Sequence, residues 1–225
     1  PADTPTKGHT MSNVSPEDPS SDPNAVMSGF FDECARRGLM QEFEEAERAK
    51  LAGFVRDWAI APGMRVLEPG CGAGRLTAVL AELVGPTGEV VACDLSREMV
   101  ARARARGLPA HVEIRQQPVS FINRPDGWFQ RVICLNVFPH FADHAAILGH
   151  MARLLSPGGE VWVNHFEGRE ALNEFHRHAG EEVHSHELPC PHTMARLMEG
   201  SGLEIAQFED TPAGYRLRAV KTGES

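Results

Sequence analysis

The sequence predicts an α/β protein in which a doubly wound, seven-stranded sheet is mainly parallel and ends in an antiparallel hairpin. Short apolar segments alternate with helical segments from residue 64 to residue 164, which is the pattern of a parallel sheet with helical crossovers. Near the end, Leu203 to Glu209 and Tyr215 to Lys221 read as strands joined by a link too short for a crossover, so they pair antiparallel. A glycine-rich turn after the first strand completes the evidence for this fold class.

Bulk composition limits the partners of the chain. It has 225 residues and carries 22 Lys+Arg against 31 Asp+Glu, a formal net charge of −9, with no long basic run. We therefore expect no nucleic-acid partner, and the absence of a long apolar stretch predicts no membrane span. The five cysteines are scattered without a C-x-x-C pair and the first residues lack a signal-peptide pattern, so we expect a cytoplasmic protein, monomeric or homodimeric.

The N-terminal quarter divides into a tail and a helical cap. Residues 1–26 are rich in Pro, Ser, Thr, Asp and Asn and predict a flexible tail. Residues 27–62 predict a short helix around Phe30–Ala35 and a longer one over Met40–Trp58, which Pro62-Gly63 ends. This cap either covers a ligand or simply packs on the sheet. The main domain is expected over residues 63–225.

The remaining elements follow in order from apolar runs and caps. Ser96 is a candidate N-cap for the second helix of the domain, and the turn Ser156-Pro157-Gly158-Gly159 ends a helix that begins near Ala142. Five strands are expected before the hairpin: Met64–Glu68, Glu89–Cys93, His111–Arg115, Phe129–Leu135 and Glu160–Asn164.

The glycine turn predicts a nucleotide-like ligand without a phosphate. Gly70, Gly72 and Gly74 follow the first strand, and Arg75 opens a helix with apolar spacing. A dinucleotide fingerprint needs its third glycine one residue later. Glu68 would repel a pyrophosphate, whereas it can accept hydrogen bonds from an ammonium group. A nicotinamide oxidoreductase is therefore the weaker alternative.

The pattern Glu-x-Gly-x-Gly-x-Gly resembles motif I of the class I S-adenosylmethionine (SAM)-dependent methyltransferases. The resemblance runs from about Phe30 to Lys221 and is closest to the small-molecule, ubiquinone/menaquinone-biosynthesis type (methyltransferase type 11/25 group). It implies a Rossmann-like fold, SAM as the methyl donor and S-adenosylhomocysteine (SAH) as the product.

The resemblance also assigns cofactor positions by motif. It implies that Asp94 takes the ribose hydroxyls, that Glu68 and the glycine turn hold the methionine portion, and that Asn136 and Val137 line that portion. The full expected set is Glu68, Gly70, Cys71, Gly72, Asp94, Leu95, Met99, Gln117, Val119, Asn136 and Val137. The family often has an acidic residue after the third strand, but here Gln117 and Val119 are the candidates to contact adenine. An Asn-Pro-Pro-Tyr sequence is absent, which disfavours DNA-adenine and protein-glutamine substrates.

Histidines supply the candidates for catalysis. His140 and His165 follow the fourth and fifth strands, whose carboxyl ends face the ligand crevice, so either is a candidate general base that removes a proton from the acceptor. Pocket walls are the simpler alternative. The later histidines leave a metal site open, but their spacing matches no standard zinc motif, so no metal ligand is assigned: His176, His178, His184, His186 and His192.

The segment 166–192 is expected to cover the substrate, and four phenylalanines suggest a partly apolar acceptor: Phe138, Phe141, Phe166 and Phe175. The sequence thus predicts a SAM-dependent methyltransferase of a small molecule. A non-catalytic SAM-binding protein or a His-rich metal-binding regulator is the alternative, and the acceptor and the methylated atom stay open.

Overall fold

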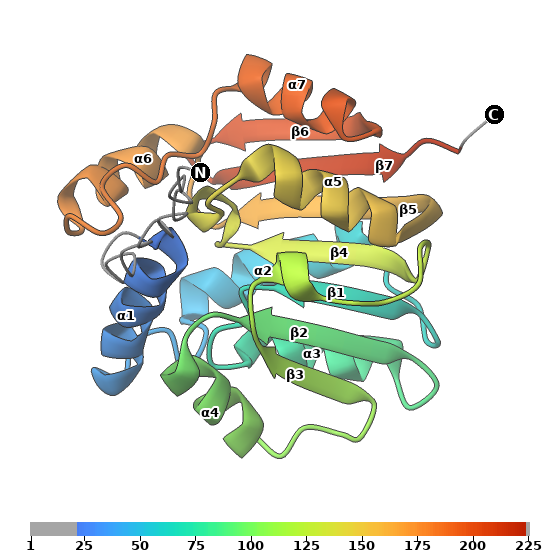
Figure 1. Cartoon of the computed structure of the whole chain (residues 1–225), viewed down its shortest axis with the longest axis horizontal. Coiled ribbons are helices and arrows are strands. Elements are labelled where there is room, and N and C mark those ends of the chain that lie inside the picture. The colour runs from blue at the N-terminus through green and yellow to red at the C-terminus, as the bar shows by residue number, and fades with distance from the viewer. Residues whose placement is uncertain (1–21, 224–225) are drawn as a thin grey trace, which may run out of the picture.

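Seven strands form one sheet in the order β3-β2-β1-β4-β5-β7-β6 in the computed structural model, which describes residues 22–223 (Figure 1). All neighbouring pairs from β3 to β5 are parallel, while β7 is antiparallel to both β5 and β6. The strands are β1 (Arg65–Pro69), β2 (Glu89–Asp94), β3 (Val112–Gln116), β4 (Phe129–Leu135), β5 (Leu155–His165), β6 (Leu203–Thr211) and β7 (Gly214–Lys221). The predicted fold class is confirmed.

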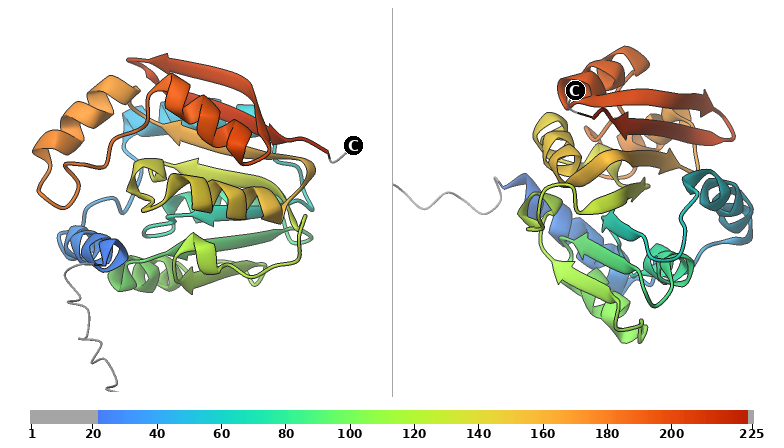
Figure 2. Two further views of the ribbon diagram at one scale, coloured as in Figure 1. Left: turned by 45° about the horizontal axis from the view of Figure 1, so that its top comes forward. Right: turned by 90° about the vertical axis from the view of Figure 1, so that its right-hand side faces the viewer.

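Helices cover both faces of the sheet (Figure 2). They are α1 (Pro23–Arg36), α2 (Glu45–Trp58), α3 (Arg75–Val84), α4 (Arg97–Ala105), α5 (His144–Leu154), α6 (Arg169–His178) and α7 (Pro191–Gly200), with short 3₁₀ turns η2 (Val119–Phe121) and η3 (Phe138–His140). No helix within residues 22–223 is long and apolar enough to cross a membrane.

The hydrophobic core lies on the two faces of the sheet because successive strand residues point to opposite sides. Leu67 of β1 packs with the α5 and α7 side, whereas its neighbour Val66 packs with α2 and α3. The same alternation separates Val132 from Ile133 in β4. Strands β1, β2 and β4 and the second half of β5 are thus buried on both faces, which is why they read as apolar runs, whereas the edge strand β3 is only half-buried.

The N-terminal helices differ from the prediction. Helix α1 begins at Pro23, before the expected start of the cap, because Asp22 caps it by accepting a hydrogen bond from the Asn24 amide at 2.9 Å. Helix α2 begins at Glu45 rather than Met40, because Met40 has a left-handed backbone with φ +58°. The stretch 37–44 is therefore a strap between two helices. Residues 1–21 of the predicted tail lie outside the described residues.

Strand β5 is also longer than predicted. It begins at Leu155, directly after α5, and Leu155 pairs with Phe129 before a shift in register at the start of β4. The Ser156–Gly159 turn therefore lies inside the strand boundaries, where Gly158 adopts φ +71°. The other strand boundaries agree with the expectation to within two residues.

Candidate functional site

One pocket opens at the carboxyl ends of β1, β2 and β4, where parallel sheets of this topology bind ligands. All eleven predicted cofactor residues line it, from the glycine turn to the β4 end. Helix α1 and the strap contribute four further lining residues: Asn24, Met27, Phe31 and Met40. The pocket therefore has a floor from the sheet and a cover from the N-terminal cap.

The glycine turn has the backbone that only glycine adopts readily. Gly70, Gly72 and Gly74 have φ values of +68°, +52° and +78°. A Cβ on Gly70 would lie 2.2 Å from Cγ2 of Val137, so a side chain is sterically excluded there. The turn thus brings bare backbone against the end of β4, and it leaves the N-terminus of α3 facing the pocket.

Glu68 is a buried acid with an unused oxygen. The residue is 2% exposed, and its Oε2 has no hydrogen-bond partner within the described chain. Burial raises the pKa of this carboxyl from its ordinary 4.5 to about 8, although the nearby Thr77 hydroxyl opposes the rise. A buried polar atom without a partner is costly, so its presence at the pocket floor points to a donor supplied by a ligand.

Asp94 closes β2 and is fixed by the backbone around it. Its Oδ2 accepts a hydrogen bond from the Gly72 amide at 2.8 Å, and its Oδ1 accepts one from the Ser96 amide at 2.9 Å. Burial raises the pKa of this carboxyl. Each oxygen keeps a further lone pair, so the carboxylate can still accept two hydroxyl donors that lie side by side.

The far end of the pocket is apolar with one free amide. Leu95, Met99 and Val119 line it, and the Nε2 of Gln117 is buried without a hydrogen-bond partner in the described part of the chain. A flat heteroaromatic ring would pack between these side chains, and the Gln117 amide would hydrogen-bond its edge.

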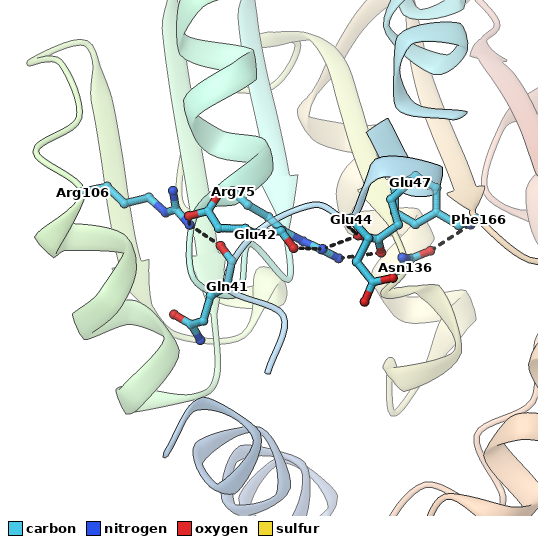
Figure 3. Close-up of polar contacts among 8 residues, drawn as sticks. All are labelled: Gln41, Glu42, Glu44, Glu47, Arg75, Arg106, Asn136 and Phe166. Atoms are coloured by element: carbon cyan, nitrogen blue, oxygen red, sulfur yellow. Dashed lines mark hydrogen bonds and ion pairs between the residues drawn. The ribbon is translucent and has the colours of Figure 1, made fainter. Parts of the chain in front are cut away.

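The end of β4 is strained and held in place. Asn136 has φ +54°, which is rare for a residue with a side chain. Its amide donates to Asn164 O at 2.9 Å and its Oδ1 accepts from the Phe166 amide at 3.2 Å, which ties β4 to the end of β5 (Figure 3). Strain of this kind persists where the surrounding contacts over-determine the backbone, and it clusters at functional sites.

The strap is fastened to the glycine turn by two arginines. The Arg106 guanidinium donates to the carbonyls of Ala73 and Gln41 and to Glu42 Oε1, the last at 2.8 Å. Arg75 donates to Glu42 O at 3.1 Å and to Glu47 Oε2 at 2.8 Å (Figure 3). Arg106 follows α4 and Arg75 begins α3, so the cover of the pocket is connected to both helices that frame it.

The two predicted catalytic histidines have different positions. His140, at the end of η3, lines the pocket, and burial together with His176, His186 and His165 lowers its pKa to about 3. His165, at the end of β5, lies outside the pocket lining. It is 1% exposed, and neither of its ring nitrogens has a hydrogen-bond partner among residues 22–223. Of the two, only His140 is in position to meet a pocket ligand.

A second cavity adjoins the first and shares Met27, His140, Phe141 and Ala142 with it. Ser185, His186 and Glu187 from the segment before α7 form its outer wall. The sequence analysis assigned no role to His186, yet its Nδ1 lies 3.3 Å from Nδ1 of His140. The signal that could have found it is the unusual density of histidines between residues 176 and 192.

Only one of the four phenylalanines expected around the acceptor lines either cavity, and that is Phe141. Phe138 and Phe166 are buried in the two core clusters, while Phe175 is exposed on α6. The expectation that these three side chains surround the acceptor was wrong. An apolar residue near a strand end can pack into the hydrophobic core as readily as it can line a pocket.

Metal ligation gains no geometric support. Within residues 22–223, no group of three or more His, Cys, Asp or Glu side chains is arranged to hold a metal ion. His178 and His184 each use Nδ1 on a neighbouring carbonyl oxygen at the surface, of Glu174 and Glu181 respectively.

Comparison with known proteins assigns the family. Residues 66–159 match a family model described as "Methyltransferase domain". The chain is 38% identical over 105 residues to a ubiquinone biosynthesis O-methyltransferase of Xanthomonas oryzae, a match that covers 45% of this chain and 43% of that protein. Residues 66–159 form a methyltransferase domain, in a fold shared with SAM-dependent methyltransferase structures.

Other relatives agree at the level of the methyltransferase domain. A Shewanella oneidensis protein named ubiquinone/menaquinone biosynthesis C-methyltransferase UbiE is 35% identical over 109 residues, covering 47% of this chain and 43% of that one. The chain thus spans less than half the length of the curated relatives it matches. A SAM-dependent methyltransferase structure from Aquifex aeolicus shares the fold with a TM-score of 0.63, at 21% identity, over 89% of this chain and 99% of that one.

The pocket of the methyltransferase domain fits the cofactor of the family. SAM carries an ammonium group, a ribose diol and an adenine ring. The pocket offers a matching group for each: the unpartnered Glu68 oxygen, the fixed Asp94 carboxylate and the unpartnered Gln117 amide. These groups lie at the ends of the neighbouring strands β1, β2 and β3, in that order.

Proposed function

We propose that the protein binds SAM in the pocket at the strand ends and transfers its methyl group to a small-molecule acceptor. The observation that carries this proposal is the pair of unpartnered buried atoms, Glu68 Oε2 and Gln117 Nε2, at opposite ends of a pocket lined by all predicted cofactor residues. SAM, when bound, supplies an electrophilic methyl group on a sulfonium sulfur.

The chain's own residues divide the binding work among three portions of the cofactor. Glu68 accepts hydrogen bonds from the ammonium group, together with the exposed backbone of Gly70, Cys71 and Gly72. Asp94 accepts from the ribose hydroxyls. A second set contacts adenine or lines the methionine portion: Leu95, Met99, Gln117, Val119, Asn136 and Val137. The remaining contribution is alignment of acceptor, methyl group and sulfur.

We further propose that His140 is the general base, because it lines both cavities and therefore lies where donor and acceptor meet. Residues 27–62 would act as a cap over the main domain 63–225, and the segment 166–192 would close the acceptor side through Ser185 and His186. Arg75 is the one lysine or arginine in either lining, and Glu47 pairs with it, so we favour an acceptor without a phosphate or carboxylate.

The relatives' names do not choose the methylated atom, because one is an O-methyltransferase and the other a C-methyltransferase. A hydroxyl group and an acidic carbon both release a proton on methylation, so either agrees with a histidine base. The five cysteines are free thiols, as is usual in a reducing compartment, so we propose that the protein is cytoplasmic. We also propose that it is a monomer or a homodimer.

The test is a calorimetric titration of the full chain with SAH. We expect one-to-one binding by the wild-type protein. Asp94→Ala should lose at least about tenfold in affinity, a change of about 1.4 kcal/mol. Asp126→Ala, which changes an exposed acid just before β4, should bind SAH as tightly as the wild type. Equal affinities for all three proteins, or no binding by folded protein, would refute the proposed site.

Product formation from isotopically labelled SAM then separates an enzyme from a non-catalytic SAM-binding protein, since the cofactor motifs report binding alone. An acceptor screen over uncharged phenols and acidic carbon compounds follows from the pocket lining. Incorporation of label into no acceptor by SAH-binding protein would favour the regulator.

A further inference from the structure

Two histidines from distant parts of the chain face each other beside the pocket. His140 Nδ1 and His186 Nδ1 lie 3.3 Å apart, a separation that fits an N–H···N hydrogen bond in which one ring donates and the other accepts. His140 comes from η3 after β4, and His186 comes from the segment between α6 and α7. One of the two rings must therefore be the Nδ1–H tautomer.

The wider surroundings keep these rings in place. The His140 ring packs edge-on against Phe31 of α1 at 5.4 Å between centroids, and lies 5.0 Å from the His176 ring. His176 in turn points Nδ1 at the backbone carbonyl of His186 at 2.5 Å, which anchors the segment that carries His186. The pair is thus held from α1, from α6 and from its own loop.

The two rings have different access to water and to ligand. His140 lines both cavities, while His186 lines only the outer one together with Ser185 and Glu187 and is partly exposed. Nδ1 of His140 faces His186, and no hydrogen bond joins its Nε2 to another described residue, so Nε2 can accept a proton from a ligand in the cavities that this ring lines. The pair forms a path from the inner pocket to the outer cavity.

We infer that His140 and His186 form a two-histidine proton relay that carries the acceptor's proton from the methyl-transfer site to solvent. The inference rests on the proposed methyl transfer and adds to it a second residue and a direction. In the resting state His140 holds its proton on Nδ1 and donates it to Nδ1 of His186, which leaves His140 Nε2 as the acceptor nitrogen.

The methyl transfer is a displacement in which every bond and proton is accounted for. The electron pair of the acceptor's O–H or acidic C–H bond becomes its new bond to the methyl group, and the pair of the broken S–C bond stays on sulfur. The acceptor's proton moves to His140 Nε2 as the Nδ1 proton of His140 moves to His186 Nδ1. His186 then releases its Nε2 proton to water, and solvent exchange restores the resting tautomers after the product leaves.

A relay explains how a histidine with so low a pKa can serve as a base. Burial and the neighbouring rings of His176, His186 and His165 lower the pKa of His140 to about 3, so His140 does not hold a positive charge. Passing one proton on while receiving another keeps the ring neutral throughout. Burial, together with the charges of His176, His144 and His184, also lowers the pKa of His186, which therefore passes the proton onward.

The decisive experiment is ¹⁵N NMR of the full chain labelled on histidine, saturated with SAH and treated with EDTA. We expect the Nδ1–H tautomer for one ring of the pair and a scalar coupling between Nδ1 of His140 and Nδ1 of His186. His186→Ala should abolish that coupling, while the control His184→Ala, two residues away and exposed, should leave it unchanged. Two Nε2–H rings without coupling would overturn the relay.

The alternative explanation for two imidazole nitrogens that face each other is that they bind a metal ion. Titration of the EDTA-treated protein with Zn²⁺ alone distinguishes it, since stoichiometric binding with metal-type ¹⁵N shifts at both Nδ1 atoms would overturn the relay. SAH calorimetry on the same samples separates the two proposals: SAH binding without the coupling refutes only the relay, whereas a coupled pair without SAH binding refutes the methyltransferase site.

Turnover supplies a second test, with catechol as the probe acceptor. If catechol is methylated, His186→Ala should lower kcat about 10²-fold, at the lower end of general-base effects, with the KM for SAM unchanged and with partial rescue by added imidazole. An unchanged kcat would contradict the relay. If catechol is not methylated, the NMR result decides.

Discussion

Glu68 is a buried acid whose ionised form is unfavourable in the ligand-free protein and would be favourable beside a bound ammonium group. In the folded chain burial raises its pKa from 4.5 to about 8, so between these values the folded protein keeps a proton that the unfolded chain has released. Folding stability from this group therefore falls as pH rises through that window. A bound ammonium group would reverse the preference and favour the carboxylate.

We predict that Glu68→Gln raises the free energy of unfolding of the ligand-free protein relative to wild type, and that this gain grows from pH 5 to pH 8. The reason is that glutamine fills the same space and does not ionise. Urea denaturation at pH 5, 6.5 and 8 measures it, with Glu204→Gln, an exposed acid on β6, as the control. A gain that is independent of pH would show that Glu68 ionises as an ordinary acid.

Helix α4 connects the cover of the pocket to the cofactor residues. Its N-cap, Ser96, donates its amide to Asp94 and its hydroxyl to Asp32 of α1, while Arg106 at its other end fastens the strap to Ala73 in the glycine turn. Cap, ribose acid and glycine turn are thus joined through one element. A strap released from α4 would leave the pocket open on the side of Met40.

We predict that Arg106→Met weakens SAH binding by about 1 kcal/mol, or about fivefold, because the strap loses its charged donor while the apolar stem is kept. Arg104→Met is the matched control, since Arg104 lies on the same helix and donates only to Ile114 O. Calorimetry measures both variants. Equal affinity for Arg106→Met and wild type would mean that the strap does not help to hold the cofactor.

At the scale of the whole molecule, a buried ionic cluster joins the parallel part of the sheet to the hairpin. Glu160 of β5 has a side chain only 8% exposed and contacts Arg131 of β4 at 3.3 Å and Arg218 of β7 at 2.5 Å. Its Oε2 also accepts from the Trp162 indole at 2.8 Å. The cluster sits where the strand direction changes, on the α2 side of the sheet.

We predict that Glu160→Gln lowers the free energy of unfolding by about 2 kcal/mol, because the buried Arg131 loses its carboxylate, whereas Arg218, whose side chain is 38% exposed, can turn to solvent. Asp126→Asn breaks the exposed Arg153 pair and should cost less than about 0.5 kcal/mol. Urea denaturation of both variants measures the difference. Similar small losses would mean that solvent reaches the cluster.

The strand–glycine turn–helix unit and the order of the elements could be predicted from the amino-acid sequence. These features depend on local sequence. Gly70 adopts a left-handed backbone at the turn from β1 to α3, and Asp94 ends the next strand of the same parallel unit. The lining of the pocket by Glu68 and Asp94 follows directly from that topology, since the ends of adjacent parallel strands meet at one edge.

Which histidine lines the pocket, and which side chain faces that histidine, depends on the three-dimensional packing. His140 ends the turn η3 that follows β4, and His165 is the last residue of the neighbouring strand β5. His140 lines the pocket, whereas His165 is buried without a partner among residues 22–223. His140 meets His186 across 46 residues of chain. The path of the loop between α6 and α7 and the rotamers of the rings bring them together, and neither hydrophobic periodicity nor motif spacing carries that information.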